Sequence, residues 1–233
     1  MNLEDFEIRV TISRAGAGLY AKGRQHFTIK NISKQTDLKI IDVYRYFDSK
    51  EDILIYFYDS IVPLYRMMIS EIDDFDSFSA GEKLSNFTYT LFDLLNEQKA
   101  FVEQTYSRYV LVGYRKSDLA KEVSKLFRHF INNDDRISTL NRQMFDGWFY
   151  GMLSRKYLSL VLLWLRDESD NQEKSMALID KLSAFVDEIL YSNVLDKGFD
   201  LLQYLYSNDF FRFDIPYLSK ILNKLSKETE DNE

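Results

Sequence analysis

The feature that most constrains the fold is a helical spacing of apolar residues that continues along almost the whole chain. Ile8, Ile12 and Leu19 are spaced to lie on one face of a helix. Residues 143–168 carry a wide apolar stripe at three- and four-residue spacing, and residues 172–194 repeat that pattern. No convincing two-residue alternation appears, and only 2 prolines and 8 glycines occur in 233 residues. The sequence therefore predicts an all-α protein of about ten helices.

Local end signals divide the N-terminal part of this pattern into three short helices. Gly23 offers a stop for the first helix. Thr28 is a good N-cap for a second helix that ends near residue 35. Residues 36–39 are typical of a turn, and a third helix is expected over residues 39–47.

A longer fourth helix is expected over about residues 50–72. Ser49 would cap it, with Asp52 as the acid of a capping box. Pro63 removes the hydrogen bond to the carbonyl of Asp59 and should kink this helix. The remaining helices are predicted at residues 82–96, 99–113, 117–132, 143–168, 172–194, 196–207 and 214–227.

Charge is distributed unevenly along the chain. The net charge is −7, but residues 8–50 contain nine cations and three acids, so this segment is about +6 and the rest about −13. A basic segment on an acidic protein can steer one end of the molecule toward a polyanion. The alternative is chance clustering on a small solvated segment.

The residues needed for most catalytic and metal sites are missing. The chain has no cysteine, which excludes disulfides and thiolate metal sites, and only two histidines, His26 and His129. None of the common nucleophile, phosphate-binding or zinc-protease motifs occurs. His129 lies beside apolar positions and is more typical of a packed or surface histidine than of a catalytic one, and the acidic run at 72–76 is more typical of a loop than of a cation site. The sequence therefore predicts no enzyme, no cofactor and no metal.

No segment of the sequence resembles a signal peptide or a membrane span. The first ten residues are acidic, and the most apolar run, residues 157–165, is far shorter than the roughly 20 residues that a span needs. A soluble, cytoplasmic protein is expected.

Residues 23–54, GRQHFTIKNISKQTDLKIIDVYRYFDSKEDIL, carry a more specific signal. Thr28-Ile29 would open the second helix, Leu38 would be the apolar turn residue, and Tyr-Arg-Tyr-Phe at 44–47 precedes Ser-Lys-Glu at 49–51. This segment resembles the helix-turn-helix DNA-binding domain of the TetR family of transcriptional regulators. The remaining helical chain has the length and layout of that family's effector-binding and dimerisation domain. The resemblance implies a DNA-binding domain at residues 1–49 and a helical ligand-binding and dimerisation domain at residues 50–233.

The resemblance also implies which residues contact double-stranded DNA. Lys39, Ile40 and Arg45 would face the major groove from the third helix. Phosphate contacts would come from Lys50, from the cap Thr28 and from the hydroxyl of Tyr44. For each aromatic residue of this helix, plain core packing is the alternative.

Three departures from the family pattern bear on DNA binding. Asp37 stands in the turn where glycine is usual, Lys39 replaces a small hydroxyl cap, and Ile41-Asp42 replaces Gly-Thr. Aspartate can adopt the left-handed turn conformation, so Asp37 is compatible with the turn. Asp42 would lie in the first turn of the third helix, where a carboxylate favours the helix dipole. Alternatively it would face DNA, repelling phosphate or accepting a hydrogen bond from cytosine.

The function that these features favour is a ligand-responsive repressor that binds a palindromic operator as a homodimer. Its effector would be a small apolar or aromatic molecule, and the long helices at 143–168 and 172–194 are the candidate dimer interface. The candidate pocket residues could equally be core; they are Tyr106, Tyr109, Phe145, Trp148 and Phe149. The alternative function is a TetR-like ligand-binding or protein-interaction module that has lost sequence-specific DNA binding. A small helical enzyme would need a catalytic group of residues that the sequence does not contain.

Overall fold

The structure of the protein is a computed structural model. It describes residues 2–139 and 147–192 and the single residues 142, 145, 197, 198, 201 and 204. Within these residues every regular element is helical and no strand occurs, which confirms the all-α prediction. None of the helices in this part of the chain combines the length and the apolar character needed to cross a bilayer. The helices predicted at 196–207 and 214–227 lie outside the described residues, apart from four isolated positions.

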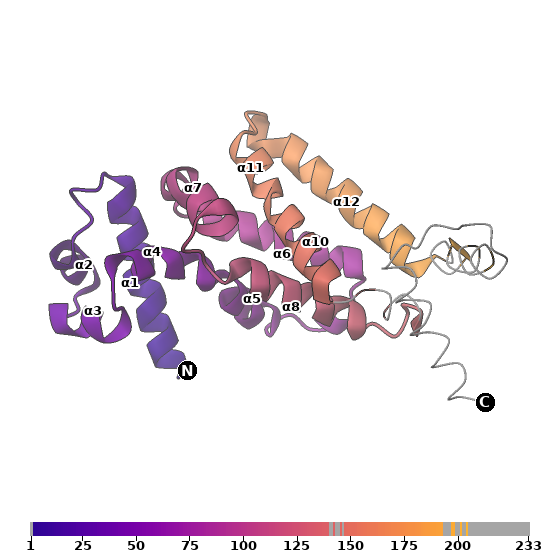
Figure 1. Cartoon of the computed structure of the whole chain (residues 1–233), viewed down its shortest axis with the longest axis horizontal. Helices are drawn as coiled ribbons and strands as arrows, with labels where there is room; N and C mark the ends of the chain where they lie inside the picture. Colours follow the sequence, from indigo (N-terminus) through magenta and orange to yellow (C-terminus); the bar gives the residue numbers. More distant parts are fainter. Residues whose placement is uncertain are drawn as a thin grey trace.

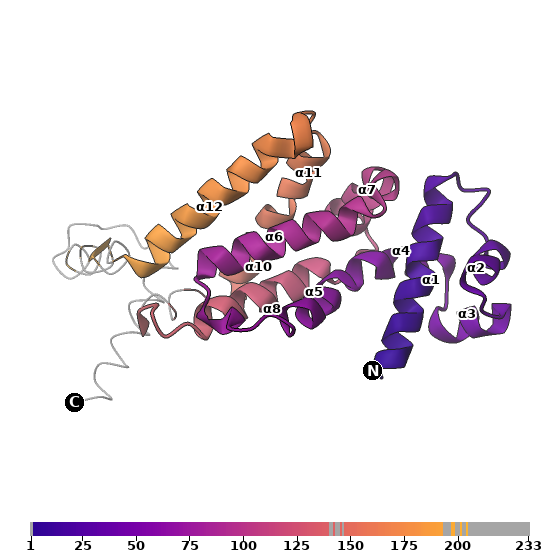
Figure 2. The same cartoon turned by 180° about the vertical axis from the view of Figure 1, so that it is seen from behind.

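Three helices form one end of the molecule, here called the head (Figures 1 and 2). They are α1 (Leu3–Ala21), α2 (Ile29–Thr36) and α3 (Ile40–Tyr46). Their bounds agree with the sequence prediction to within two residues at the ends of α2 and α3. The long α1 packs against α2 on one side and against the next helix, α4, on the other. The core of the head is formed by fully buried side chains such as Ile12, Ile32, Val43 and Ile53.

Helix α4 (Lys50–Asp59) leads from the head into the rest of the chain, here called the body. Ser49 caps it by accepting a hydrogen bond from the backbone N–H of Asp52 at 3.2 Å. The predicted single helix over residues 50–72 is two helices, because the chain turns at Ser60 and continues as α5 (Ile61–Ile69). Pro63 is the third residue of α5 and lacks the N–H that would have bonded to the carbonyl of Asp59. The predicted kink therefore lies just before the proline.

Two closely packed helix pairs form the largest part of the body. Helix α10 (Gly147–Leu158) packs against α8 (Leu119–Asn132), and α12 (Glu173–Tyr191) packs against α6 (Ala80–Asn96). The remaining elements are η1 (Phe75–Ser77), α7 (Lys99–Tyr106), the π-helix η2 (Ser107–Val112), α11 (Leu160–Leu165) and η3 (Asp170–Gln172).

Two of the long helices predicted for the body are interrupted in the structure. The segment predicted as one helix at 99–113 changes from α7 to the π-helix η2 at Ser107. The segment predicted at 143–168 is broken at Ser159, between α10 and α11. Apolar spacing does not reveal these breaks, because the apolar residues continue on both sides of each.

Aromatic side chains fill much of the body core. Tyr58 of α4 stacks on Phe101 and meets Tyr106 edge-on, with ring centroids 5.8 Å apart in each pair. The hydroxyl groups of these buried tyrosines have partners: Tyr58 bonds to Thr105 at 2.7 Å, and Tyr106 donates to the carbonyl of Leu158 at 2.8 Å. Burial of these rings therefore leaves no unpaired hydroxyl at these two positions.

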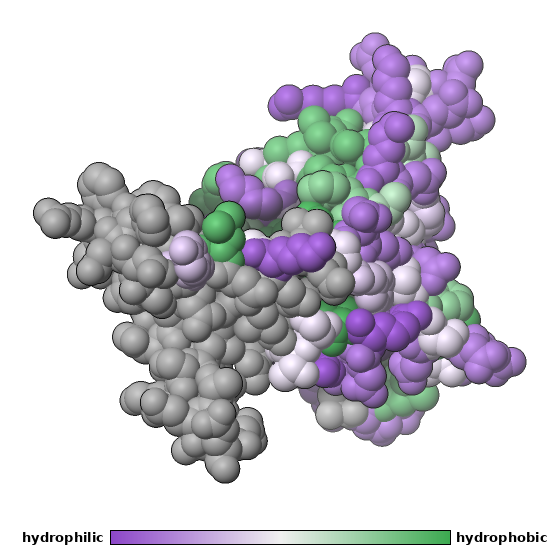
Figure 3. Space-filling view, turned by 90° about the vertical axis from the view of Figure 1, so that its right-hand side faces the viewer, coloured by the Kyte–Doolittle hydropathy of each residue, from purple (hydrophilic) through white to green (hydrophobic). Residues whose placement is uncertain are grey.

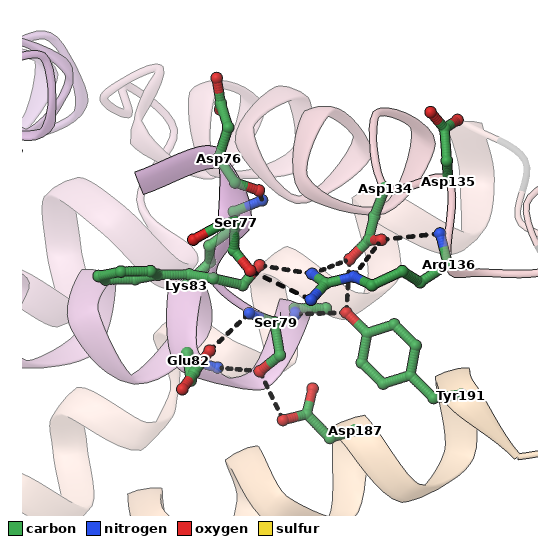
Figure 4. A network of polar contacts seen from close by, with 12 residues as sticks. Asp76, Ser77, Ser79, Glu82, Lys83, Asp134, Asp135, Arg136, Asp187 and Tyr191 are labelled. Atoms are coloured by element: carbon green, nitrogen blue, oxygen red, sulfur yellow. Dashed lines mark hydrogen bonds and ion pairs between the residues drawn. The ribbon is translucent and has the colours of Figure 1, made fainter. Parts of the chain in front are cut away.

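A polar network joins the C-terminal half of α12 to the start of α6 (Figure 4). Asp187 accepts hydrogen bonds from the Ser79 hydroxyl and from the backbone N–H of Gly81, each at 2.6 Å. Tyr191 accepts from the backbone N–H of Ala80 at 2.8 Å and donates to Asp134 at 2.5 Å. These contacts use the free N–H groups at the beginning of α6, and so they fix the position of α12 on the body.

Candidate nucleic-acid interface

Local hydrogen bonds set the angle between α2 and α3. The side chain of Thr28 accepts from the backbone N–H of Asn31 at 3.2 Å and caps α2, as predicted. Asp37 ends α2 in the left-handed conformation, with φ 57° and ψ 20°. The hydroxyl of Ser33 donates to the carbonyl of Leu38 at 2.6 Å and holds the turn. Aspartate thus occupies the conformation that the usual glycine would take, and the departure at this position leaves the turn intact.

Helix α3 turns one face inward and the other to solvent. Val43 and Phe47 are buried and pack the helix onto the head. Tyr46 donates its hydroxyl to Asp5 of α1 at 3.2 Å, so it serves packing within the head. Ile40 and Tyr44 are exposed, the latter at 54%.

The free face of α3 therefore presents aliphatic, aromatic and cationic groups. Ile41 is 65% exposed, and the side chain of Arg45 is 76% exposed. Aliphatic groups can contact thymine methyls, and guanidinium groups can bind guanine or phosphate, so this face has the chemistry of a groove reader.

Asp42 forms an ion pair on this same face. Its carboxylate lies 3.6 Å from the guanidinium of Arg45, one turn further along α3. It is the third residue of the helix, and its backbone N–H bonds to the carbonyl of Lys39 at 2.9 Å. Asp42 therefore favours the helix dipole and at the same time neutralises the most exposed cation of α3.

The cations of the basic segment divide into two groups. Arg9 lies over the rings of Phe47 and Tyr56, 5.0 and 4.4 Å from their centroids, and Arg14 pairs with Glu97 at 3.1 Å. These two arginines bind within the protein and do not add to an outward positive surface. The other cations of this segment are exposed: Lys22, Arg24, Lys30, Lys34, Lys39, Arg45 and Lys50. The electrostatic part of a DNA interface would therefore rest on these seven.

The body holds both ends of α4 through residues 107–118, and these contacts are here called the clasp. At the first turn of α4, Arg108 bonds to Glu51 at 2.7 Å, and Arg115 pairs with both Glu51 and Asp52. At the last turn, the backbone N–H of Asp118 donates to Asp59 at 2.6 Å. Since α4 also packs against α1, the clasp links the body directly to the orientation of the head. No local pattern predicts these pairs, because the partners are 57 to 64 residues apart.

Asp59, at the junction between α4 and α5, has a partly buried carboxyl group with a raised pKa. Burial raises the pKa of its carboxyl to about 6, with Asp118 and Glu122 adding to the rise. The hydrogen bond from the Asp118 N–H and the charge of Arg9 oppose this rise without cancelling it. A charge at this position therefore disfavours the folded state near neutral pH.

Replacing Asp59 with asparagine should stabilise the protein at pH 7.5 and leave it unchanged at pH 4. The folded pKa lies above the unfolded value of about 3.9, so the stability supplied by the neutral acid is complete below pH 3.9 and is lost as the pH rises through 6. The amide removes that loss, and we expect a gain of about 1–2 kcal/mol at pH 7.5. Urea unfolding at both pH values measures the free energy of unfolding of each variant.

The exposed Asp93→Asn is the control and should leave that free energy unchanged at both pH values. An equal gain in stability at both pH values for Asp59→Asn would contradict this role of Asp59.

The residues predicted to line a ligand pocket lie in two separate places. Tyr106 and Tyr109 are buried in the core beside α4. Phe145 and Phe149 stack at 4.4 Å at the other end of α10, and Trp148 beside them is 65% exposed. None of these five residues lines the main hollows found among the described residues, and the ligand-lining role stays a prediction. The core-packing alternative holds for the two tyrosines.

An apolar groove runs between α10 and α12. It has a volume of about 230 Å³, and its walls are mainly aliphatic, with Leu84 of α6, Leu153 of α10 and Val186 of α12 among them. Large apolar side chains outside the groove remain exposed on the same helices, including Met152 and, at 61%, Phe185. Figure 3 shows hydrophobic side chains gathered in the upper part of the molecule, the level at which α11 and α12 lie in Figure 1. These helices thus keep large apolar side chains that the described residues do not cover.

Within the described residues, no group of three or more histidine and acidic side chains is placed to hold a metal ion. The acidic run at 72–76 forms a turn followed by η1, in which Phe75 is buried against the body.

Comparison with known protein families gives a match over the body. The family model described as "Tetracyclin repressor-like, C-terminal domain" matches residues 83–205, which is more than half of the chain. The match begins in α6 and includes the clasp and helices α8 to α12. No curated protein matches the chain.

Proposed function

The chain belongs to the tetracycline repressor-like family of transcriptional regulators, and we propose that it is a ligand-responsive repressor that binds a palindromic operator as a homodimer. In this proposal residues 1–49 form the DNA-binding domain, and residues 50–233 form the ligand-binding and dimerisation domain. A small molecule bound to the body would release the operator. The family match covers the body, so the DNA-binding role of the head rests on its own geometry.

The observation that carries the proposal is the free face of α3 at the far end of the head. Two short helices joined by a tight turn leave α3 with its inner side packed and its outer side open. This is the arrangement in which a recognition helix enters the major groove. Lys39, Ile40 and Arg45 would face base edges, while Thr28, Tyr44 and Lys50 would contact phosphates.

The apolar surface of α10 and α12 supports a dimer. The described residues leave Trp148 and Met152 of α10 and Phe185 of α12 exposed, and exposed large apolar side chains of this kind are typical of a protein interface. A two-fold axis through this surface would place the same helices of both protomers against each other. The two heads would then point in the same direction, as a palindromic operator requires.

One observation favours the second candidate, a related module that has lost specific DNA binding. The ion pair between Asp42 and Arg45 occupies the exposed face of α3 and lowers its positive charge. In that case the body would still bind a ligand or a protein partner, while the head would contact DNA weakly or not at all.

A binding titration against genomic fragments separates the two candidates. The purified full chain is added to a fragment pool at 50 mM and at 200 mM salt. A repressor retains a small set of fragments at both concentrations, with affinity falling steeply as salt rises. If no fragment shows salt-dependent binding, the repressor proposal is wrong and the second candidate stands.

Replacing Asp42 with asparagine should strengthen DNA binding. The change removes the carboxylate that pairs with Arg45 at 3.6 Å and keeps the size of the side chain. Exposed ion pairs contribute up to about 1 kcal/mol, so we expect affinity to rise about two- to fivefold. Fluorescence anisotropy with a retained fragment measures the change. Asp48→Asn, with the same charge change elsewhere in the head, should give a smaller gain. A large loss for Asp42→Asn alone would mean that Asp42 reads a base.

A further inference from the structure

A large polar cleft lies between the clasp, the start of α8 and the C-terminal half of α10. Its volume is about 890 Å³, within the range of small-molecule sites. Unlike the apolar groove, it is lined by cationic and hydroxyl side chains as well as by apolar ones such as Val110, Leu111 and Leu158, and its walls contain no carboxylate among the described residues. The side chains that supply this chemistry are Lys116, Lys121, Arg155, Lys156, Ser117, Ser124, Ser154 and Ser159.

The four cations of the cleft are only weakly compensated. Arg155 and Lys156 form no ion pair with any described residue. Lys116 donates to the carbonyl of Leu111 at 2.8 Å, a neutral partner that leaves its charge in place. Lys121 has an exposed contact with Asp118 at 3.9 Å. On a protein of net charge −7, such a concentration of positive charge is unusual and favours an anionic ligand.

Ser117 provides an independent indication of a ligand. The residue is 9% exposed, and its hydroxyl oxygen is buried without a hydrogen-bond partner in the described structure. Its backbone N–H donates to the carbonyl of Tyr109 at 2.8 Å, which fixes the position of the residue. A buried hydroxyl without a partner costs stability, and native proteins seldom keep one unless something binds it. Ser117 lines the cleft, but its hydroxyl oxygen is closed to solvent, so a ligand accepts its hydrogen bond only when the loop that carries Ser117 moves toward the cleft.

We propose that this cleft binds a phosphorylated small molecule. Phosphate groups offer several acceptor oxygens and more than one negative charge, which suits four cations and a free hydroxyl donor. Arg155 can bind two phosphate oxygens at once, while the lysines act as point charges. The chemistry of this cleft differs from the apolar or aromatic effector expected from the sequence.

The cleft is also connected to α4, and this part of the inference rests on the proposed function. Lys116 and Ser117 lie in the same loop as Arg115 and Asp118, which hold the two ends of α4. A ligand that draws Lys116 and Ser117 toward itself would change the contacts of that loop with α4. Because α4 packs against α1, the orientation of the head would change with it.

Binding can be tested on the full chain without DNA. Inorganic pyrophosphate is the probe, measured by isothermal titration at low ionic strength, with sodium chloride at equal ionic strength as the blank. We expect saturable binding that weakens at least tenfold in Arg155→Gln/Lys156→Gln and is unchanged in Lys181→Gln, an exposed lysine of α12. The site is overturned if binding is not saturable. It is also overturned if the double variant and the Lys181→Gln control lose affinity equally. Binding of citrate without pyrophosphate overturns the phosphate assignment.

Ser117→Ala separates a ligand-binding role from a structural one. Removal of a buried hydroxyl without a partner should leave the melting temperature of the free protein equal or higher, while pyrophosphate binding weakens roughly threefold to tenfold. Ser13→Ala is the matched control, because its hydroxyl is also buried without a partner but lies outside the cleft. It should leave pyrophosphate binding unchanged. A lower melting temperature with unchanged binding for Ser117→Ala would overturn the role of this hydroxyl.

A DNA-release experiment tests separately whether ligand binding in the cleft is coupled to DNA binding. Pyrophosphate should release a retained DNA fragment from the normal protein, but not from Arg108→Gln/Arg115→Gln, which keeps the cleft and loses the ion pairs of the clasp at the first turn of α4. Equal release from both proteins overturns the coupling through α4. If the chain retains no DNA at all, the proposed function fails, whereas the titration with pyrophosphate still decides the cleft.

Discussion

Replacing Lys39, Arg45 and Lys50 together with alanine should lower DNA affinity by about a hundredfold or more at 100 mM salt. All three side chains are exposed on the open side of the head, and none is buried in its core. A lysine on phosphate and an arginine on a base each contribute about 1–3 kcal/mol, and the three effects should approximately add. Fluorescence anisotropy with a retained fragment measures the loss, and the slope of affinity against salt should fall in parallel.

The matched control for that variant replaces three exposed cations of the body, Arg166, Lys174 and Lys181, with alanine. It changes the net charge by the same amount, far from α3. Its affinity should stay within a few-fold of the normal protein, and circular dichroism should show both variants folded. Equal losses in the two variants would mean that overall charge, rather than the face of α3, determines binding.

Replacing Phe185 with glutamate should separate the protomers and abolish operator binding. Phe185 is 61% exposed, so the change should leave the folded protomer intact. In a dimer the new carboxylate would be buried without a partner, which costs about 3–5 kcal/mol for each side chain. We therefore expect the dimer to weaken by at least about a hundredfold, as measured by analytical ultracentrifugation.

Ala184→Glu is the control for this change. Ala184 is exposed and lies about 100° around α12 from Phe185, away from the groove. Its dimer should keep the normal dissociation constant. If Phe185→Glu leaves the mass of the dimer unchanged, the interface lies on another surface.

Sequence reasoning succeeded where the signal is local. Thr28 and Ser49 cap α2 and α4 through bonds to residues three positions ahead. Asp37 adopts the left-handed turn conformation that aspartate tolerates. Each of these features depends on a few neighbouring residues, so the sequence of the segment contains the information.

Features that depend on distant residues could not be predicted. Arg9 and Arg14 are among the nine cations of residues 8–50, but Arg9 lies over the rings of Phe47 and Tyr56, and Arg14 pairs with Glu97. The clasp and the polar cleft bring together segments that no local pattern connects. The role of Asp42 is intermediate: its place at the third position of α3 was predicted, while its pairing with Arg45 required the structure.

The separation of the two α3 helices in the dimer tests the central claim most directly. The chain has no cysteine, so the exposed Gln35→Cys variant carries a single spin label beside α3 without a change of charge. Pulsed dipolar spectroscopy then gives the label-to-label distance, with and without a retained fragment. The proposed repressor predicts a distance near 34 Å, about one turn of DNA, in a distribution that narrows on DNA. A distance beyond about 50 Å on DNA, or no dipolar signal, would contradict a dimer that reads adjacent major grooves.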